Sequence, residues 1–355
     1  MRLPRLGVGV IAVCILVVAA PLGAQQLKIV QIDNLQLPTT PIQLDTLWAV
    51  GRNTMHGVDS VFQVISSIGL DSTGPSPRLL VLDFRDAVLR AFDMNGKFLM
   101  KVGRQGEGPS EFRIPTALSV APDGHIFVYD PGLGRLTEFS NDLELIRTLA
   151  PKAAVGPALS MVVLKDDIVM ASVVLSGPGA GRVIHVLDRE TGAYRRSFGT
   201  PPPAPSDRVA RLIGAGRVRL GRDGSLWYAY VAPYIIENYG LDGRLRFRIE
   251  RPAKWLPPAG DAYEIALSSS RARITNQEYA QSAGVIELPD GRVLHQTFLT
   301  DGRDVLDWYD SAGHLVDSRI GRIPILNISL GNGRYVAVGG GKDETAWFGV
   351  VQVNP

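Results

Sequence analysis

The sequence predicts an all-β fold, a six-bladed β-propeller, from three observations. Tight-turn signals recur along the chain, short β-rich segments lie between them, and the repeat ends one strand short at the C-terminus. Most turn signals contain Asn-Gly or Asp-Gly, which supplies the positive φ angles that a two-residue hairpin needs. Four strands joined by two such hairpins match one propeller blade. At 355 residues the chain is long enough for one large all-β domain.

The turn signals form two alternating series, as expected for the two hairpins of each blade. The first series lies at residues 72–74, 122–124, 165–167, 222–224, 289–291 and 331–333, and the second at residues 94–96, 140–142, 190–192, 241–243 and 311–313. They predict five complete blades, at residues 63–103, 116–149, 159–199, 218–250 and 284–321, and a sixth that begins at residue 325.

The sixth blade has only three strands before the chain ends at Pro355, so its fourth strand must come from elsewhere. Residues 43–51 align with the outer strand of blade one, residues 96–103, and the same kind of turn follows each. We therefore expect residues 43–51 to pair with the C-terminal blade and close the ring, which makes residues 25–355 a single domain. Closure also removes exposed sheet edges. The alternative, two β-sandwich domains, needs a linker and a break in the repeat, and we find neither.

Residues 1–24 have the layout of a secretory signal peptide. Two arginines precede an apolar run at residues 6–20, and a small-residue cleavage site ends at Ala24. We expect a periplasmic or secreted protein with no membrane span after cleavage. The alternative, an uncleaved membrane anchor, is disfavoured by the short apolar run and the Gly-Ala exit. The one cysteine, Cys14, lies inside this segment, so the mature chain has no thiol or disulfide.

The mature chain is close to neutral. Without Arg2 and Arg5, 35 basic residues stand against 35 acidic ones. Sequence-independent binding to a phosphate backbone needs a clear positive excess, so we expect no nucleic-acid partner. We expect the protein to be a monomer.

The segment KVGRQGEGPSEFRIP, residues 101–115, raises two interpretations. Its glycines loosely match a phosphate-binding loop, but such a loop lies between a strand and a helix, whereas the residues after Pro115 alternate as in a strand. The second interpretation is a blade junction that turns the chain at the rim. We expect Phe112, and Phe62 in the equivalent turn, to fill the wedge between adjacent blades, because buried aromatic residues usually pack.

This junction resembles that of NHL-repeat propellers. There a glycine-rich turn, Gly-Pro, Phe and Pro precede an apolar strand ending in Pro-Asp-Gly, as in residues 103–124 here. The match continues through residues 126–130 and 135–139 and recurs at residues 43–62, but fades to turn residues and strand pattern in blades three to six. The resemblance implies a bacterial exported six-bladed propeller and supports the fold more than any activity.

Binding residues are expected on the face that carries the long irregular loops. Four of its six loops between second and third strands contain an arginine, and two further loop-face residues complete the predicted ligand-binding set: Arg85, Asp130, Arg135, Arg182, Tyr230 and Arg303. Converging guanidinium groups would favour carboxylate or phosphate ligands. The alternative is that each arginine is a solvated charge or pairs locally with Asp86, Asp130 or Asp301.

Residues 252–283 form a long insertion with apolar residues at helical spacing, which predicts a lid over the channel.

The sequence offers no catalytic motif. The five histidines are scattered without metal-ligand spacing, and neither Gly-x-Ser-x-Gly nor His-Glu-x-x-His occurs. We therefore expect a non-catalytic binding or scaffolding propeller that recognises a protein, peptide, glycan or small molecule on its loop face. The alternative, implied by similar six-bladed propellers, is a metal-assisted hydrolase or lyase of the lactonase or NHL-lyase type. Its calcium would lie in the channel, held by dispersed side chains such as Asp83, Asp130 and Asp188.

Overall fold

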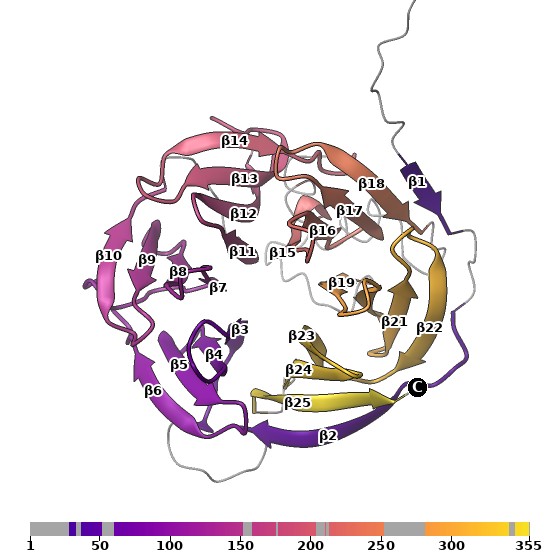
Figure 1. Ribbon diagram of the computed structural model, residues 1–355, viewed down its shortest axis with the longest axis horizontal. Helices are drawn as coiled ribbons and strands as arrows, with labels where there is room; N and C mark the ends of the chain where they lie inside the picture. The colour runs from indigo at the N-terminus through magenta and orange to yellow at the C-terminus, as the bar shows by residue number, and fades with distance from the viewer. Residues whose placement is uncertain are drawn as a thin grey trace, which may run out of the picture.

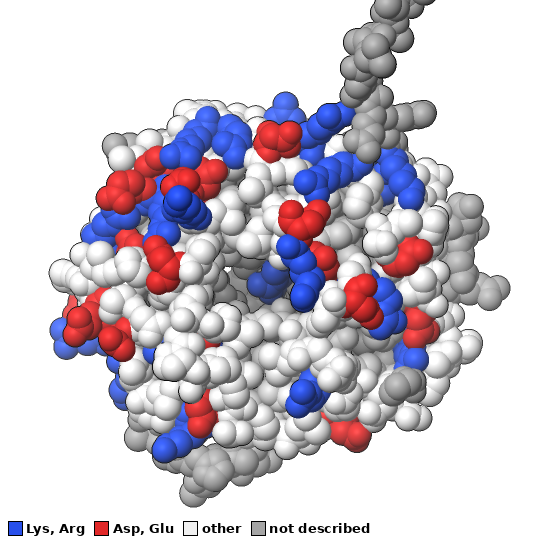
Figure 2. All heavy atoms as spheres, in the orientation of Figure 1, with Lys and Arg blue, Asp and Glu red and all other residues white. Residues whose placement is uncertain are grey.

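Six β-sheets form a ring in the computed structural model, which confirms the predicted six-bladed propeller (Figure 1). The ring has a hollow at its centre, here called the channel (Figure 2). The structure describes residues 28–32, 37–51, 60–151, 158–174, 177–203, 210, 213–251, 281–340 and 345–354. In each blade the first strand lies at the channel, the last lies at the outer rim, and consecutive strands pair in antiparallel fashion.

The strand bounds follow the predicted blades closely. Blade one contains β3 (Ile65–Asp71), β4 (Arg78–Asp83), β5 (Val88–Asp93) and β6 (Phe98–Val102), and blade two contains β7 (Ala117–Val120), β8 (Ile126–Asp130), β9 (Arg135–Phe139) and β10 (Leu145–Leu149). Blade three contains β11 (Ser160–Val163), β12 (Asp167–Val174), β13 (Arg182–Asp188) and β14 (Tyr194–Phe198), and blade four contains β15 (Gly216–Leu220), β16 (Leu226–Tyr230), β17 (Ile235–Tyr239) and β18 (Leu245–Glu250). Blade five contains β19 (Gln281–Glu287), β20 (Val293–Phe298), β21 (Asp304–Tyr309) and β22 (Leu315–Gly321).

Blade six combines both ends of the chain. Its first three strands are β23 (Ile325–Gly331), β24 (Arg334–Gly339) and β25 (Trp347–Asn354), and its outer strand is β2 (Gln43–Val50). β2 and β25 are antiparallel, with Gln43 opposite Asn354 and Val50 opposite Phe348. The predicted closure by residues 43–51 is therefore confirmed.

The segment before β2 crosses two further blades, which the sequence did not predict. β1 (Lys28–Gln31) adds a fifth, parallel strand to β18 at the rim of blade four. Further along, the Ile42 N–H donates to the Ile320 carbonyl of β22 in blade five (2.9 Å). The N-terminal segment thus ties together blades four, five and six at the rim (Figure 1).

The blade junctions have the structure expected from residues 101–115. Phe112 is fully buried in the cluster between blades one and two, and Phe62 is 2% exposed in the cluster between blades six and one. Gly103 has a φ of +101°, and a Cβ there would lie 2.6 Å from the Phe112 ring. Only glycine lets the chain turn this closely over the aromatic wedge.

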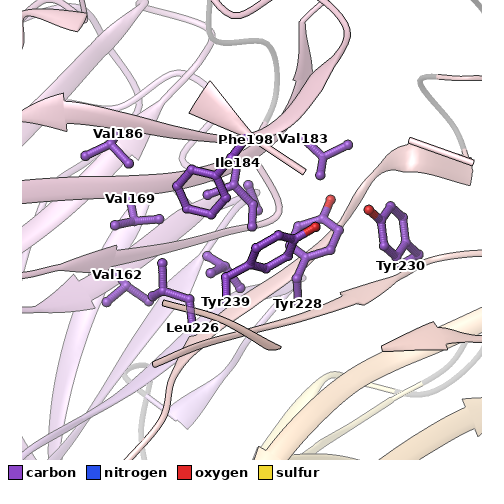
Figure 3. Close-up of a cluster of buried hydrophobic side chains, with 12 residues drawn as sticks. Val162, Val169, Val183, Ile184, Val186, Phe198, Leu226, Tyr228, Tyr230 and Tyr239 are labelled. Atoms are coloured by element: carbon purple, nitrogen blue, oxygen red, sulfur yellow. The ribbon is translucent and has the colours of Figure 1, made fainter. Parts of the chain in front are cut away.

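Apolar clusters fill the spaces between neighbouring blades. Figure 3 shows the cluster between blades three and four, to which Val169 and Val186 belong from blade three and Leu226 and Tyr228 from blade four. Polar links join inner strands at the channel: Ser119 accepts a hydrogen bond from the Val163 N–H (3.0 Å), and the Ser160 hydroxyl accepts one from the next blade. Each blade is therefore held by its neighbours as well as by its own ladder.

Two sequence predictions fall outside the described residues. These are the signal peptide at residues 1–24 and most of the insertion at residues 252–283. β19 begins at Gln281, so the last three residues assigned to the insertion belong to blade five. In the part of the chain that is described, no helix is long and apolar enough to cross a membrane.

We expect Gly349→Ala to weaken ring closure. A Cβ at Gly349 would lie 2.2 Å from the Trp48 carbonyl oxygen of β2, so β2 must move away from β25. Such overpacking costs about 1–3 kcal/mol. Thermal unfolding should show a lower midpoint, and limited trypsin digestion should release the N-terminal segment sooner. The control is Gly74→Ala, because nothing lies within 4 Å of that Cβ. Identical melting and digestion of the two variants would contradict the importance of this contact.

Candidate functional site

The predicted loop-face arginines do not form a ring of converging guanidinium groups. Arg303 pairs with the neighbouring Asp301 (2.6 Å). Arg182 is exposed and donates to the Thr200 hydroxyl (2.9 Å). Arg85 is exposed, and its guanidinium makes no ion pair with any described residue. The contacts of these three arginines agree with the alternative, in which each loop arginine pairs locally or is solvated.

Arg135 supports the blade junction. Its guanidinium donates to the carbonyl oxygens of Glu107 (3.1 Å), Gly108 and Glu111, which lie in the turn that opens blade two. Three backbone carbonyl groups therefore bind the guanidinium N–H groups of Arg135, which we expected to face a ligand.

Asp130 has a similar structural position. Its side chain is fully buried and accepts hydrogen bonds from the backbone N–H groups of Arg113 (2.6 Å), Ile114 (3.0 Å) and Leu133 (3.1 Å). Asp83 accepts the equivalent N–H bonds of Gln63 and Val64 in blade one. A carboxylate in this position fixes the junction to the loop after the second strand. Both oxygens of Asp130 already accept backbone hydrogen bonds, so Asp130 does not have the ligand-binding position that we expected.

Tyr230 is buried between blades three and four. Its hydroxyl donates to the Glu237 carboxylate (2.7 Å), and Tyr228 and Tyr239 lie beside it (Figure 3). Burial and the Glu237 charge raise the pKa of Tyr230 above its ordinary value. Of the six predicted residues, only Asp130 and Arg135 are neighbours, as cross-strand partners of β8 and β9.

The channel wall carries a different pair of charges. The six inner strands are β3, β7, β11, β15, β19 and β23, and their charged residues are Asp71, Arg217, Arg219 and Glu287. Asp71 and Glu287 lie at strand ends. Asp71 accepts a hydrogen bond from Arg78 Nε (2.9 Å), and Glu287 accepts one from Trp227 Nε1 (3.1 Å). Arg217 and Arg219 lie in the interior of β15 and make no ion pair with a described residue. Figure 2 shows Lys or Arg atoms at the edge of the central hollow.

Alternation along β15 places Arg217 and Arg219 on one face. Val218, between them, is buried in the cluster with blade three, so the two arginines face blade five. There the stem of Arg217 packs against Gly284 of β19, where a Cβ would lie 3.0 Å from the Arg217 Cδ. Both side chains are half-buried, and the Arg219 Nε is enclosed without a hydrogen-bond partner in the described structure.

The electrostatic setting of this pair is unfavourable without a counterion. Burial lowers the pKa of Arg217, and burial together with the Arg217 charge lowers the pKa of Arg219 to about 10. Two residues along a strand are about 7 Å apart, and unit charges at that distance repel by about 2 kcal/mol at an effective dielectric constant near 20. Both groups remain cationic at neutral pH, so an anion placed here would relieve the repulsion.

Sequence reasoning missed this site because it searched the loops. The available signal was the segment Gly216-Arg-Val-Arg-Leu220, because the other five inner strands carry no charge except at their ends. Recognising it requires assigning this segment to the channel wall before asking which side chains are unusual there.

A second charged cluster lies on the face with the tight hairpins, between blades two and three. It lines a cleft of about 670 Å³ and includes Asp123, His125, Glu138, Arg147 and Arg189. Glu138 is 3% exposed and contacts His125 Nδ1 (2.7 Å) and Arg147 Nε (2.5 Å), while Arg189 of blade three reaches Asp123 of blade two (2.6 Å). Figure 2 shows acidic and basic side chains gathered on this side of the ring, near β10, β13 and β14.

The charges of this cluster are mutually satisfied. Burial alone would raise the pKa of Glu138, but the hydrogen bonds from His125 and Arg147 outweigh it and hold the pKa below its ordinary value. The Arg147 guanidinium also donates to the Glu190 carbonyl oxygen in blade three (2.9 Å). The cluster therefore ties two blades together, and His125 is one of its members.

Two further buried titratable groups lie in blade five. His295 Nε2 lies 2.8 Å from the Ser282 hydroxyl of β19, and burial lowers the pKa of His295 to about 3. Asp304 of β21 accepts hydrogen bonds from Gln296 (3.0 Å) and the Ile323 N–H (3.2 Å), and burial raises its pKa to about 6. In the described ranges, no three His, Cys, Asp or Glu side chains are arranged to hold a metal ion.

Comparison with known proteins supports the fold. A family described as a six-bladed β-propeller matches residues 72–154, which is less than half of the chain. No curated protein matches the sequence.

Solved structures are similar over nearly the whole chain. A member of the DUF4221 family from Bacteroides vulgatus has a TM-score of 0.63 at 10% identity, covering 89% of this chain and 99% of its own. A Bacteroides fragilis protein described as exported has a TM-score of 0.60 at 11% identity, covering 93% and 100%. A streptogramin B lyase has a TM-score of 0.50 at 12% identity, covering 88% and 98%. At such identities the likeness concerns the fold alone, and that fold includes at least one enzyme.

We expect Glu138→Gln to destabilise the protein strongly. The variant leaves Arg147 and Arg189 facing a neutral amide in a buried setting, and removing one partner of a buried ion pair costs on the order of 3 kcal/mol. The control is Asp301→Asn, which breaks the exposed pair with Arg303 and should cost less than about 1 kcal/mol. Urea unfolding of both variants measures the difference. Equal losses would show that the cluster does not stabilise the junction of blades two and three.

We expect Asp304 to make stability fall as the pH rises. Its folded pKa of about 6 lies above the ordinary 3.8, so its contribution is complete below about pH 4 and is lost as the pH passes 6. Asp304→Asn should remove this dependence. Between pH 4 and pH 6 the free energy of unfolding of the variant should therefore rise relative to that of the wild type by roughly 1 kcal/mol per pH unit. Asp301→Asn should show the opposite sign and only below about pH 4, because hydrogen bonds from Arg303 lower the pKa of Asp301 below its ordinary 3.8. Melting curves between about pH 2 and pH 8 test both, and parallel curves for wild type and Asp304→Asn would contradict the assignment.

Proposed function

We propose that the protein is an exported, non-catalytic binding propeller that holds an anionic ligand in its central channel through Arg217 and Arg219. Export rests on the signal-peptide layout of residues 1–24. The similarity in fold to a protein described as exported is consistent with it.

The proposal rests on Arg217 and Arg219 of β15, which form no ion pair with any described residue. Elsewhere, buried arginines such as Arg78 and Arg251 have carboxylate partners at 2.9 Å or less. Arg217 and Arg219 share a half-buried face, repel each other and have no carboxylate partner among the described residues. A fold that keeps such an unfavourable arrangement of charges usually does so for function.

Guanidinium groups suit carboxylate and phosphate ligands. Each presents a planar fork of N–H donors that can make two parallel hydrogen bonds to one anionic group. The absence of a side chain at Gly284 gives the Arg217 stem the space to lie against the channel wall.

The Ser282–His295 contact supports binding over hydrolysis. It is a hydroxyl–imidazole contact on an inner strand, the geometry from which a serine nucleophile could be activated. However, burial lowers the pKa of His295 to about 3, so this imidazole is a weak base at neutral pH. The contact is better explained as a buried hydrogen bond that fixes β19 to β20.

We expect the double variant Arg217→Gln/Arg219→Gln to be more stable than the wild type in the absence of ligand. Loss of the mutual repulsion should raise the free energy of unfolding by about 1 kcal/mol at low salt, and less at high salt. The control is Arg85→Gln, which removes an exposed, unpaired loop charge and should change little. Urea unfolding in a buffer free of multivalent anions measures all three proteins.

A stability of the double variant equal to or below that of the wild type would contradict the proposal. Thermal melts of the wild type and the double variant with calcium and with EDTA address the hydrolase or lyase alternative. A rise of several degrees with calcium, retained in the double variant, would favour that alternative.

A further inference from the structure

We infer that the channel ligand carries two negative charges: a phosphate or sulfate group, or a pair of carboxylates. The inference rests on the proposed function and specifies the chemical class of its ligand. It follows from the charges on the channel wall.

Among the described residues, the interior of the channel wall has two positive charges without a carboxylate partner. Arg217 and Arg219 are its charged residues away from the strand ends, and the two carboxylates at strand ends are already bonded elsewhere. The other partly exposed residues on the inner strands are neutral, among them Ser67, Asn327 and Ser329. A ligand with one negative charge would neutralise one guanidinium and leave the other without a counterion.

The two arginines are held as a pair. They stand two residues apart on the same face of β15, opposite Ala229 and Trp227 of β16. Packing of Arg217 against Gly284 and enclosure of the Arg219 Nε restrict how far either side chain can turn away. A dianion can therefore contact both groups, whether as one tetrahedral oxyanion or as two linked carboxylates.

The test compares anions of different charge at equal ionic strength. The purified protein is melted with chloride, acetate, succinate or sulfate, and with phosphate at pH 6 and pH 8, where its second ionisation changes its charge. Because sulfate stabilises many proteins by exclusion from their surface, each shift is measured relative to Arg217→Gln/Arg219→Gln under the same conditions. Arg85→Gln is the control for loss of an arginine elsewhere.

We expect succinate, sulfate and phosphate at pH 8 to raise the melting temperature by several degrees in the wild type only, whereas acetate and chloride do not. The lysine double variant Arg217→Lys/Arg219→Lys keeps both charges and should keep the preference for dianions, with weaker binding. A single Arg219→Gln variant should lose that preference and respond equally to acetate and succinate.

Two results separate the inference from the proposed function. If acetate stabilises the wild type as much as succinate and sulfate do, relative to the double variant, an anion binds the arginines but the two-charge inference is wrong. If no anion distinguishes the wild type from the double variant, both the inference and anion binding at this site are wrong.

Discussion

Pairing of β2 with β25 is the contact on which the rest of the structure depends. Inter-blade packing fixes each sheet against two neighbours, and this is possible for all six only when the ring is closed. The closing strand is covalently continuous with β1 on blade four, so the same N-terminal segment also ties blades five and six together at the rim. A ring held in this way keeps the six inner strands at a fixed spacing. That spacing gives the channel a defined wall and holds Arg217 and Arg219 in place.

Many charged side chains of this protein serve the joints between blades. Asp83 and Asp130 bind backbone N–H groups of the junctions, Arg135 binds junction carbonyls, and Glu138 joins blades two and three through its cationic partners. The β-ladders of separate blades leave backbone groups unpaired at the junctions, and buried polar groups need partners. These charged residues therefore bind structural partners and are not available for ligands.

The channel arginines differ from these residues because no part of the described fold needs them as partners. The polar links between blades near the channel use neutral side chains: Ser119 of β7 bonds β11, and Gln296 of β20 bonds β23. A neutral residue at Arg217 or Arg219 would keep the β15 ladder and remove the repulsion. The pair therefore fits a binding role, and the stable ring supplies the rigidity that holds two like charges together.

The sequence by itself determined the number of blades, their bounds to within a few residues and the closing strand, because hairpin signals and strand alternation are local properties. It also determined that Phe62 and Phe112 fill wedges, since glycine-rich turns around a lone aromatic repeat at both junctions. Only the tertiary structure decided which charges are free. Asp130 binds the Ile114 N–H 16 residues away and Arg189 binds Asp123 66 residues away. That Arg217 has no ion-pair partner among the described residues depends on six strands that meet at the channel. Local patterns show which residues are charged, but the electrostatic free energy of each charge depends on contacts that form when distant segments pack.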